Sequence, residues 1–591
     1  MRQFPGVRPL VANASRELRQ MAGTAYHPGT DYAVRPMTAE ERKVIVASSL
    51  GTVFEWYDFY LYGSLAVIIG AKFFTQFDET TRNIFALLAF AAGFLVRPFG
   101  ALIFGRIGDL VGRKYTFLVT IGIMGLSTFL VGMLPTADSI GLLAPTILIA
   151  LRLLQGLALG GEYGGAATYV AEHAPHGRRG FYTSWIQTTA TLGLFLSLLV
   201  ILFTRTWLGE EAFASWGWRI PFLVSIILLG ISIWIRLQLQ ESPAFVRMKE
   251  EGTQSKAPLS EAFGQWKNAK WALLALLGLV AGQGVVWYTG QFYALFFLQQ
   301  TLKVDGYSAN LLIAWSLVIG TGSFIFFGWL SDKIGRKVII LAGCLIAALT
   351  YFPLFKALTH AGNPALYQAQ ESTTVTVTAD PANCSFQFNP VGTAKFTSSC
   401  DIIKGLLARN AVNYTTVDAP AGTIASVQIG PTIIEAFDAA TAGPDAKAKQ
   451  DELTKAVSEA LAAAGYPKAG DLSIVKLAHP FDIFRGQPIS VIVILTVLVV
   501  YVTMVYGPIA AALVELFPTR IRYTAMSLPY HIGNGWFGGL LPATAFAIVA
   551  QHGNIYSGLW YPIIIAAATF VIGLLFVPET KDRDIFAEDV R

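Results

Sequence analysis

The chain has 591 residues, of which 54% are hydrophobic and only 14% are charged. Soluble domains carry about 25% charged residues, so this composition excludes an ordinary water-soluble protein and indicates a lipid environment. The formal net charge of +5 arises from Lys and Arg concentrated in a few loops, and it gives no reason to expect a nucleic-acid partner.

The N-terminal segment 1–43 is polar and ends in Glu40-Glu41-Arg42-Lys43. It contains no short apolar core followed by a small-residue cleavage site, so we expect no cleavable signal peptide. The segment is therefore predicted to be a tail that precedes the first membrane span.

Apolar runs follow this tail along most of the chain. A helix needs about 20 mainly apolar residues to cross roughly 30 Å of hydrocarbon. A soluble helical protein with so many buried helices would keep almost no wetted surface, so we predict an all-α membrane protein. Twelve transmembrane helices are expected, at residues 44–70, 83–104, 115–134, 142–170, 181–204, 218–239, 271–299, 309–330, 338–357, 488–514, 523–550 and 557–577.

The first predicted span contains two carboxylates, Glu55 and Asp58, with Tyr57 between them. Residues three apart share a helix face, and two acids that close in an apolar span favour protonation of at least one of them. An ionisable residue inside the bilayer is a candidate functional group. We therefore expect Asp58 and Glu55 to carry a proton and Tyr57 to contact a substrate; a structural hydrogen bond to a neighbouring helix is the alternative.

The second span holds Arg97, twelve residues before Asp109. At 1.5 Å per residue this separation is about 18 Å, which places Arg97 near the middle of the membrane. A guanidinium there needs an anion, either a substrate carboxylate or Asp58. We expect Arg97 to bind substrate and to attract Asp58, and a permanent internal ion pair is the alternative.

The fourth span combines close-packing glycines with polar groups. Glycines every four residues, from Gly156 to Gly164, let helices approach closely. Arg152, Gln155 and Glu162 lie on the same otherwise apolar helix. We expect Glu162 to take part in proton coupling and Gln155 to contact substrate.

The chain contains an internal repeat. The pattern Gly-x3-Asp-x2-Gly-Arg-Lys occurs after the second span and again after the eighth, and a weaker Glu-x2-Pro pattern with arginines occurs after the fourth and tenth. The two copies place their acids and bases at Asp109, Arg113 and Glu172 in the first half and at Asp332, Arg336 and Glu515 in the second.

The repeat also reveals an insertion. Asp109 and Glu172 lie 63 positions apart, whereas Asp332 and Glu515 lie 183 apart, so the second half carries about 120 extra residues. These fall at 360–485, between spans nine and ten. Alternating or helical patterns at 373–378, 384–388, 400–410 and 445–464 predict a small α/β domain, and a disordered loop is the alternative.

Positive residues predict the orientation of the chain. Loops on the cytoplasmic side are enriched in Lys and Arg. The even-to-odd loops and both tails carry Arg35, Arg42, Lys43, Arg106, Arg113, Lys114, Arg178, Arg179, Lys333, Arg336, Lys337, Arg520, Arg522, Lys581 and Arg583, whereas the short loops of the other side hold little beyond Lys72, Arg82, Arg205 and Lys303. Both termini are thus expected in the cytoplasm and the insertion outside, where Cys384 and Cys400 are free to form a disulfide.

The spans of the second half are nearly free of charge. Their polar and aromatic groups include Gln283, Tyr288 and Gln291 in span seven and His531 and Asn534 in span eleven. We expect the three amides and Tyr288 to contact a substrate. His531 is interpreted as a structural residue, with proton transfer as the alternative.

Sequence patterns of enzymes are missing. There is no Gly-x4-Gly-Lys-Ser/Thr phosphate loop and no metal-ligand cluster in the sequence. We therefore expect no catalytic residues, no metal and no cofactor.

The two Gly-x3-Asp-x2-Gly-Arg-Lys copies resemble the signature of the major facilitator superfamily. The segments that begin at Gly51, Arg97, Arg152 and Phe517, together with Glu241-Ser-Pro and Pro578-Glu-Thr, resemble its metabolite:proton symporter branch. That branch includes carriers of α-ketoglutarate, citrate, shikimate and proline or betaine. The resemblance covers the chain except the tail and the insertion.

The resemblance implies two six-helix bundles that alternate access to a central substrate site. It implies a cytoplasmic gate formed by Asp109 and Arg113 and their repeats Asp332 and Arg336, and a role in proton coupling for Arg152. We expect Glu172 and Glu515 to pair with these gate residues. Antiporters of the superfamily usually carry Gly-Pro in span five. Here that span reads Thr191-Leu-Gly193-Leu-Phe without proline, which favours symport over efflux.

The predicted protein is thus a multi-pass carrier of the bacterial inner membrane that moves a small organic acid or zwitterion with protons; a nutrient sensor and an efflux antiporter are the alternatives. Its partners are the solute, protons and the bilayer, and its oligomeric state stays open. The expected organisation is a cytoplasmic tail (1–43), a first bundle (44–240), a cytoplasmic linker (241–270), a second bundle (271–359 and 486–577), an external domain (360–485) and a cytoplasmic C-terminal tail (578–591).

Overall fold

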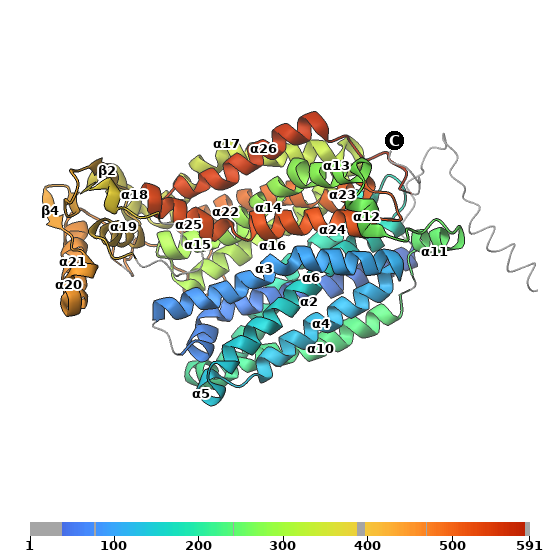
Figure 1. Ribbon diagram of the computed structural model, residues 1–591, viewed down its shortest axis with the longest axis horizontal. Helices are drawn as coiled ribbons and strands as arrows, with labels where there is room; N and C mark the ends of the chain where they lie inside the picture. The colour runs from blue at the N-terminus through green and yellow to red at the C-terminus, as the bar shows by residue number, and fades with distance from the viewer. Residues whose placement is uncertain (1–37, 76–78, 240, 387–395, 469, 586–591) are drawn as a thin grey trace, which may run out of the picture. The chain divides into compact units, whose positions relative to one another are not determined.

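The computed structural model describes residues 38–75, 79–239, 241–386, 396–468 and 470–585 (Figure 1). Residues 43–591 form one unit of the structure, and everything below concerns that unit. It is mostly helical, with one small sheet.

Ten helical segments of the described chain are long and apolar enough to cross a membrane, which confirms the mostly helical architecture predicted from the sequence. Each is bounded by charged, Gly or Pro residues where its apolar run ends. They are α4 (Arg113–Met133), α6 (Leu143–His173), α7 with α8 (Arg179–Leu208), α10 (Arg219–Leu237), α13 to η4 (Trp266–Thr301), α16 (Gly306–Ile334), α17 (Arg336–Gly362), α22 with α23 (Gly486–Leu516), α24 with α25 (Arg522–His552) and η8 with α26 (Ser557–Phe576).

Two further long helices, α2 (Ala39–Phe73) and α3 (Glu79–Leu110), precede these segments and coincide with the first two predicted spans. Helix α3 packs mainly against α6 and also contacts α24. Glycines make this close approach possible, because a Cβ at Gly100 or Gly156 would overlap backbone atoms of the facing helix. The packing role that the sequence predicts for such glycines follows from this geometry.

Two segments of the second half contain π-helical turns. The segment Trp266–Thr301 contains η2 (Leu276–Val280), η3 (Thr289–Tyr293) and η4 (Phe297–Thr301), and η7 (Gly533–Gly538) joins α24 (Arg522–Ile532) to α25 (Leu541–His552). The helix α14 (Ala281–Tyr288) packs against η7. Such turns frequently occur at functional sites because they re-aim side chains within a helix.

Short helices connect the long ones. The linker between the first half of the unit (43–237) and the second half (266–577) contains α11 and α12, whose ends are set by Ser242 as an N-cap and by proline at their first turns. The bounds of these connecting elements are α5 (Ala137–Ile140), α9 (Glu210–Ala212), η1 (Phe213–Gly217), α11 (Pro243–Glu250) and α12 (Pro258–Phe263).

The insertion contains the predicted small sheet, in the order β2-β1-β3-β4. Strands β1 and β2 are parallel and are joined through α19, whereas β3 and β4 add antiparallel neighbours. Alternate residues of β1 are buried, as expected for a strand with one face on a core. The elements are α18 (Pro364–Ser372), β1 (Val375–Ala379), η5 (Pro381–Asn383), α19 (Ser399–Arg409), β2 (Thr415–Asp418), β3 (Ser426–Ile429), β4 (Thr432–Glu435), α20 (Ala439–Ala442), η6 (Gly443–Asp445) and α21 (Ala446–Ala463).

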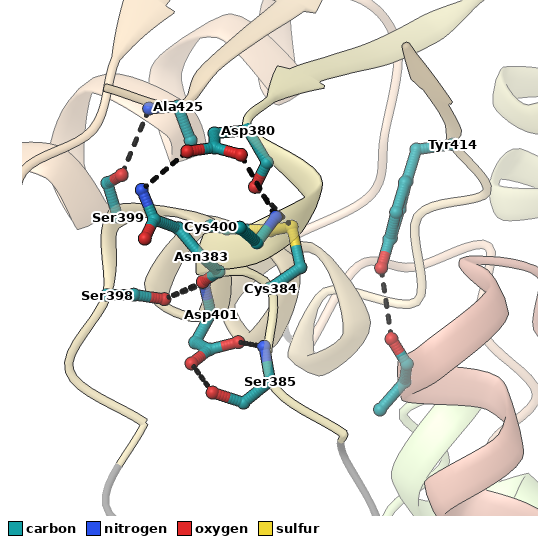
Figure 2. Close-up of a disulfide and its surroundings, with 12 residues drawn as sticks. Asp380, Asn383, Cys384, Ser385, Ser398, Ser399, Cys400, Asp401, Tyr414 and Ala425 are labelled. Carbon is teal, nitrogen blue, oxygen red and sulfur yellow. Dashed lines mark hydrogen bonds between the residues drawn. A yellow bond between two sulfur atoms is a disulfide. The ribbon is translucent and has the colours of Figure 1, made fainter. Parts of the chain in front are cut away.

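Cys384 and Cys400 form a disulfide in this domain, with their Cα atoms 5.2 Å apart (Figure 2). The strand expected at 384–388 is wrong for 384–386, which form no strand, and 387–388 lie outside the described residues. The reason is local. The backbone and hydroxyl of Ser385 donate hydrogen bonds to the Asp401 carboxylate at 2.8 and 2.6 Å, which ties this segment to the start of α19 instead of to the sheet.

Candidate functional site

The first repeat motif forms a buried ion cluster at one end of the helices, which we call the motif end. Asp109 closes α3 and Arg113 opens α4, with Oδ1 and Nη1 3.1 Å apart. The Asp109 carboxylate also accepts hydrogen bonds from the backbone N–H and the hydroxyl of Thr524, at 2.9 and 2.7 Å. Thr524 lies in the first turn of α24, so a carboxylate of the first half caps the positive N-terminus of a second-half helix.

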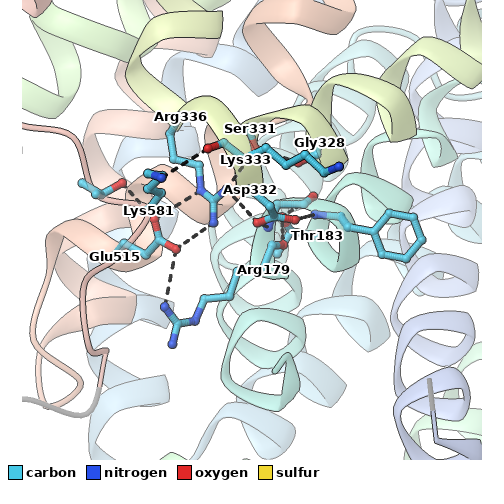
Figure 3. Close-up of polar contacts among 12 residues, drawn as sticks. Arg179, Thr183, Gly328, Ser331, Asp332, Lys333, Arg336, Glu515 and Lys581 are labelled. Carbon is cyan, nitrogen blue, oxygen red and sulfur yellow. Dashed lines mark hydrogen bonds and ion pairs between the residues drawn. The ribbon is translucent and has the colours of Figure 1, made fainter. Parts of the chain in front are cut away.

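The second motif repeats this arrangement with the halves exchanged. Asp332 pairs with Arg336 at 2.7 Å and accepts hydrogen bonds from the backbone N–H groups of Gly180 and Phe181, both at 2.8 Å (Figure 3). Those two residues lie in the first turn of α7 (Arg179–Gln187), in the first half. The two motifs therefore hold the halves together at the motif end by equivalent contacts.

The two glutamates of the weaker repeat complete each cluster. Glu172 lies 2.8 Å from Arg522 and 3.8 Å from Arg113. Glu515 lies 3.1 Å from Arg336 and 3.5 Å from Arg179 (Figure 3). Each glutamate thus joins an arginine of its own half to an arginine of the other half.

Two acids outside the predicted set support both clusters. The Glu241 carboxylate accepts a hydrogen bond of 3.2 Å from the backbone N–H of Arg113. The Glu579 carboxylate accepts one of 2.8 Å from the backbone N–H of Arg336. Sequence reasoning placed Arg179 and Arg522 in the weaker repeat, and Glu241 and Glu579 in segments that resemble the family, but included none of them in the gate. Arg179 and Arg522 each lie seven residues after the glutamate of their repeat, Glu172 or Glu515, and this equal offset could have identified them.

A histidine lies beside the second cluster. His176 lies beside Arg179, with Nδ1 and Nη2 3.5 Å apart. Burial, and then the neighbouring Arg179 guanidinium, lower the pKa of His176 below its usual range. His176 therefore stays neutral at pH 7 and adds no charge to the ion pairs.

A cavity lies between the two halves and combines one guanidinium with several aromatic rings. Arg97 points its guanidinium carbon to within 4.5 Å of the Phe94 ring centroid. The rings of Tyr163 and Tyr530 stack across the halves with centroids 3.6 Å apart, and Trp56 lies 5.0 Å from Trp287. The lining residues are Thr52, Trp56, Phe59, Arg97, Leu159, Tyr163, Ile186 and Gln187 from the first half and Trp287, Tyr288, Tyr506, Tyr530, His531 and Asn534 from the second.

Three of the seven predicted substrate residues, Arg97, Tyr288 and Asn534, line this cavity. Gln283 lies directly behind Asn534, and the two amides exchange hydrogen bonds of 3.0 Å in both directions. Gln283 therefore fixes the orientation of the Asn534 side chain.

The other predicted contacts lie elsewhere. The hydroxyl of Tyr57 donates to the carbonyl of Pro221 at 2.6 Å. Gln291 accepts a hydrogen bond of 3.0 Å from the Tyr60 hydroxyl. Neither Tyr57 nor Gln291 is among the residues that line the cavity.

Asp58 ends a buried chain of hydrogen bonds within the first half. The Thr128 hydroxyl donates to Asp58 Oδ2 at 2.7 Å, Gln155 Nε2 donates to Thr128 Oγ1 at 2.6 Å, and Arg152 Nη1 donates to Gln155 Oε1 at 2.5 Å. The sequence analysis placed Gln155 at the substrate and missed Thr128, because one hydroxyl on an apolar helix carries no signal of its own.

Arg152 acts electrostatically on Asp58, and Arg97 acts on Arg152. The expected attraction between Arg97 and Asp58 stays a prediction. Arg152 also stacks on the Tyr62 ring, 4.1 Å from its centroid, which stabilises the position of its guanidinium.

The remaining predicted proton carriers differ in their surroundings. Glu162 forms a buried ion pair of 2.6 Å with Arg236 and accepts a hydrogen bond of 2.8 Å from Thr120. Arg236 lies at the end of α10 and was not among the predicted site residues. Glu55 belongs to α2, but its side chain lies outside the described part of the structure.

Comparison with known proteins agrees with this architecture. The profile of the family described as "Sugar (and other) transporter" matches residues 43–270 and 474–589. The chain is 36% identical to the shikimate transporter of Escherichia coli K12 over 54% of this chain and 72% of that protein. It is 37% identical to the proline/betaine transporter of the same strain over 53% of this chain and 64% of that protein.

A solved structure of the proton:xylose symporter XylE has the same fold, with a TM-score of 0.58 at 15% identity over 93% of this chain and 98% of that one. The match to the family profile covers more than half of the chain. The chain is therefore a membrane transporter and not an enzyme, and it belongs to the sugar (and other) transporter family of the major facilitator superfamily.

Proposed function

We propose that the protein imports a small organic acid or zwitterion together with protons by alternating access. The observation that carries this proposal is the position of Arg97 in the cavity between the halves, with Arg152 linking it electrostatically to the buried Asp58. Shikimate, proline and betaine, named for the two relatives, all contain a carboxylate. A guanidinium is the side chain best suited to bind that group, through two parallel hydrogen bonds.

The substrate site is proposed to have two parts. Arg97 binds the carboxylate, and the aromatic rings of Trp56, Trp287 and Tyr288 contact the body of the solute. Asn534 donates its two N–H groups to Gln283 and to the Tyr530 carbonyl, so its side-chain oxygen, which accepts one bond from Gln283, supplies an acceptor for a polar substituent. An apolar wall with a few placed polar groups is the usual composition of a small-molecule site. Both an anion and a zwitterion fit this arrangement.

Coupling is proposed to run through Arg152. A carboxylate bound at Arg97 also attracts Arg152, which weakens the hold of Arg152 on Asp58. Asp58 then keeps a proton more readily and donates it in a hydrogen bond to Thr128 Oγ1, which accepts in place of donating. Because linkage is reciprocal, a proton on Asp58 favours substrate binding to the same extent.

The membrane topology is proposed to contain twelve helices in two bundles of six (44–240 and 271–359 with 486–577), with α2 and α3 as the first two. The tails 1–43 and 578–591 and the linker 241–270 lie in the cytoplasm of a bacterial cell, and the domain 360–485 lies outside between helices nine and ten. The motif end is then the cytoplasmic gate. Its paired clusters represent the state in which that gate is closed.

Purified protein in liposomes tests this function. A panel of labelled organic acids, betaines and sugars is offered with and without an inward proton gradient. We expect carboxylate-bearing solutes to accumulate only with the gradient. Asp58→Asn keeps the shape of the carboxyl but cannot ionise, so it should lose gradient-driven accumulation and retain solute exchange.

Arg97→Lys should weaken substrate binding because an ammonium lacks the planar fork of a guanidinium. Arg219→Lys is the matched control, since Arg219 binds the backbone carbonyls of Gly132 and Leu134 and does not line the cavity. Proton-driven accumulation by Asp58→Asn, or accumulation of uncharged sugars alone, would refute the proposal.

A further inference from the structure

The segment that joins the inserted domain to α22 exposes three large apolar side chains. Leu472 is 100% exposed, Phe481 is 67% exposed and Phe484 is 82% exposed. Single exposed apolar residues are common, but two phenylalanines three positions apart on one short turn form a patch that needs a partner.

Hydrogen bonds attach this segment to the long helices. The backbone N–H of Val475 donates to the carbonyl of Gly362 at 2.9 Å, and that of Leu477 donates to the Ser308 hydroxyl at 2.8 Å. Farther along, the Trp315 indole N–H donates to the carbonyl of Pro480 at 2.7 Å. The chain therefore descends along α16 from its first turn to Trp315.

The turn that follows lies directly on Trp315. The rings of Phe481 and Trp315 meet edge to face with centroids 5.8 Å apart. Ile483 is buried at 7% exposure, which anchors the turn to the protein and leaves Phe481 and Phe484 on its outer side. We call residues 478–485 the aromatic turn.

The position of Trp315 along α16 gives the depth of the aromatic turn. Trp315 precedes Ile334, the last residue of α16. That separation of about 19 residues is about 28 Å at 1.5 Å per residue, close to the roughly 30 Å thickness of the hydrocarbon. Since Ile334 belongs to the motif end, Trp315 and the aromatic turn lie at the opposite boundary between lipid and water.

Trp315 also lies on the outward apolar face of α16. Ile319, Gly322, Phe326 and Trp329 follow it at alternating steps of four and three, and all four are exposed. Such a stripe on a membrane-spanning helix faces the lipid. Exposed Ile489 and Val493 continue the apolar surface on α22 just after the turn.

We propose that the aromatic turn inserts Phe481 and Phe484 into the interfacial layer of the bilayer and anchors the inserted domain to the lipid surface. The occupant of this surface is lipid because the turn is continuous with the lipid-facing stripe and lies at interfacial depth. Aromatic side chains are enriched at that depth, and burial of apolar side chains there favours binding.

The polar groups of the turn are arranged to tolerate this environment. Asp482 accepts a hydrogen bond from the backbone N–H of Ala478 at 3.0 Å and pairs with Arg485 at 2.5 Å. The backbone N–H of Asp482 in turn donates to the carbonyl of His479 at 3.0 Å. Backbone groups that are satisfied within the turn lose little when water is partly removed.

The test uses the full chain in liposomes of phosphatidylethanolamine and phosphatidylglycerol. Cys344→Ser removes the buried free thiol and leaves the Cys384–Cys400 disulfide intact. Single cysteines at Phe481→Cys, Phe484→Cys and, as the matched control, Ile433→Cys carry a nitroxide label. Ile433 is also exposed, at 69%, but lies on β4 in the inserted domain.

Collision of each label with oxygen, which enriches in lipid, and with a water-soluble nickel chelate reports its depth. We expect the labels at 481 and 484 to be several-fold less accessible to the nickel chelate than the label at 433, and more accessible to oxygen. Equal nickel accessibility at 484 and 433 would place the turn in water and overturn the proposal, leaving a soluble protein as its partner.

A second measurement uses the unaltered protein and does not depend on labelled variants. A lipid with a photoactivated group near the top of its acyl chain should form adducts on the peptide that contains 478–485. The peptide that contains β3 and β4 (426–435) should stay unmodified. Adducts on neither peptide, or equally on both, would contradict insertion of the aromatic turn.

Discussion

The two halves of the transporter repeat their ion clusters at the motif end but not the side chains that line the cavity. At the motif end, every ion pair of the first cluster has a counterpart in the second, from the Asp–Arg pair to the glutamate that joins two arginines. In the cavity the halves differ. The first half supplies Arg97, with Arg152 and Asp58 behind it, whereas the second half lines the cavity with aromatic rings, His531 and Asn534.

This difference separates two tasks that a carrier must perform. A gate that closes between two halves benefits from equivalent contacts, because each half then caps a helix of the other and neither moves alone. The proposed coupling of solute to proton needs unlike groups near the cavity, and the first half supplies Arg97, Arg152 and Asp58 for it. The second half supplies the cavity with aromatic walls and with polar side chains such as Asn534.

The largest effect should come from removal of either gate glutamate. Glu172→Gln leaves Arg522 buried without its anion and Arg113 paired with Asp109 alone. Glu515→Gln likewise leaves Arg179 without its anion and Arg336 paired with Asp332 alone. Loss of one partner of a buried pair costs about 3–5 kcal/mol. Thermal unfolding in detergent should show similar losses of stability for both variants. A large loss of stability for only one variant would show that the two clusters are not equivalent.

Variants of Glu162 and Asp58 should distinguish a carboxylate that stabilises the fold from one that carries the coupled proton. Glu162→Gln leaves Arg236 buried without an anion and should lower the free energy of unfolding by about 3 kcal/mol. Asp58→Asn should change stability little, because Asn can still accept the hydrogen bond from Thr128. Stability by thermal unfolding and accumulation by liposome uptake are compared for both variants. A stable Glu162→Gln that loses proton coupling would move the proton site to Glu162.

The inserted domain, which the second half alone carries, should be stabilised by its disulfide. The two cysteines are 16 positions apart, and closing a loop of that length should contribute about 3 kcal/mol to the stability of the domain. The double variant Cys384→Ser, Cys400→Ser should become sensitive to limited proteolysis between 375 and 435. Transport by the same preparation serves as the control and should persist. Unchanged protease resistance would show that the sheet and its core suffice.

The smallest effect should come from the motif aspartates. Asp109→Asn and Asp332→Asn keep the shape of the carboxyl and leave Arg113 and Arg336 near Glu172 and Glu515. They remove the negative charge, and one accepting oxygen, from the N-termini of α24 and α7. A change of about 1–3 kcal/mol between gate states should reduce turnover roughly tenfold and leave substrate affinity nearly unchanged. Equal reductions in turnover for the two variants would support the equivalence of the two motifs. A change in affinity for one variant alone would show that its motif also communicates with the cavity.

Much of the fold was determined by the sequence itself. Apolar runs of membrane length predicted the helices, because the bilayer demands about 20 apolar residues per crossing. The unequal spacing of Asp109–Glu172 and Asp332–Glu515 predicted the insertion and its position. Helical periodicity predicted α19 and α21 closely, whereas the strand expected after Cys384 was overruled by hydrogen bonds from Ser385 to Asp401, which belong to the tertiary structure.

Residue types alone also identified the groups that belong near the site, since charge inside a bilayer is expensive and therefore rare. Only the tertiary structure decided which of them meet. It joined Glu162 to Arg236 from another helix, linked Asp58 to Arg152 through Thr128 and Gln155, and so turned Gln155 toward Thr128. The physical reason is that partner choice depends on helix rotation and crossing, which arise from packing against distant segments and leave no pattern in the local sequence.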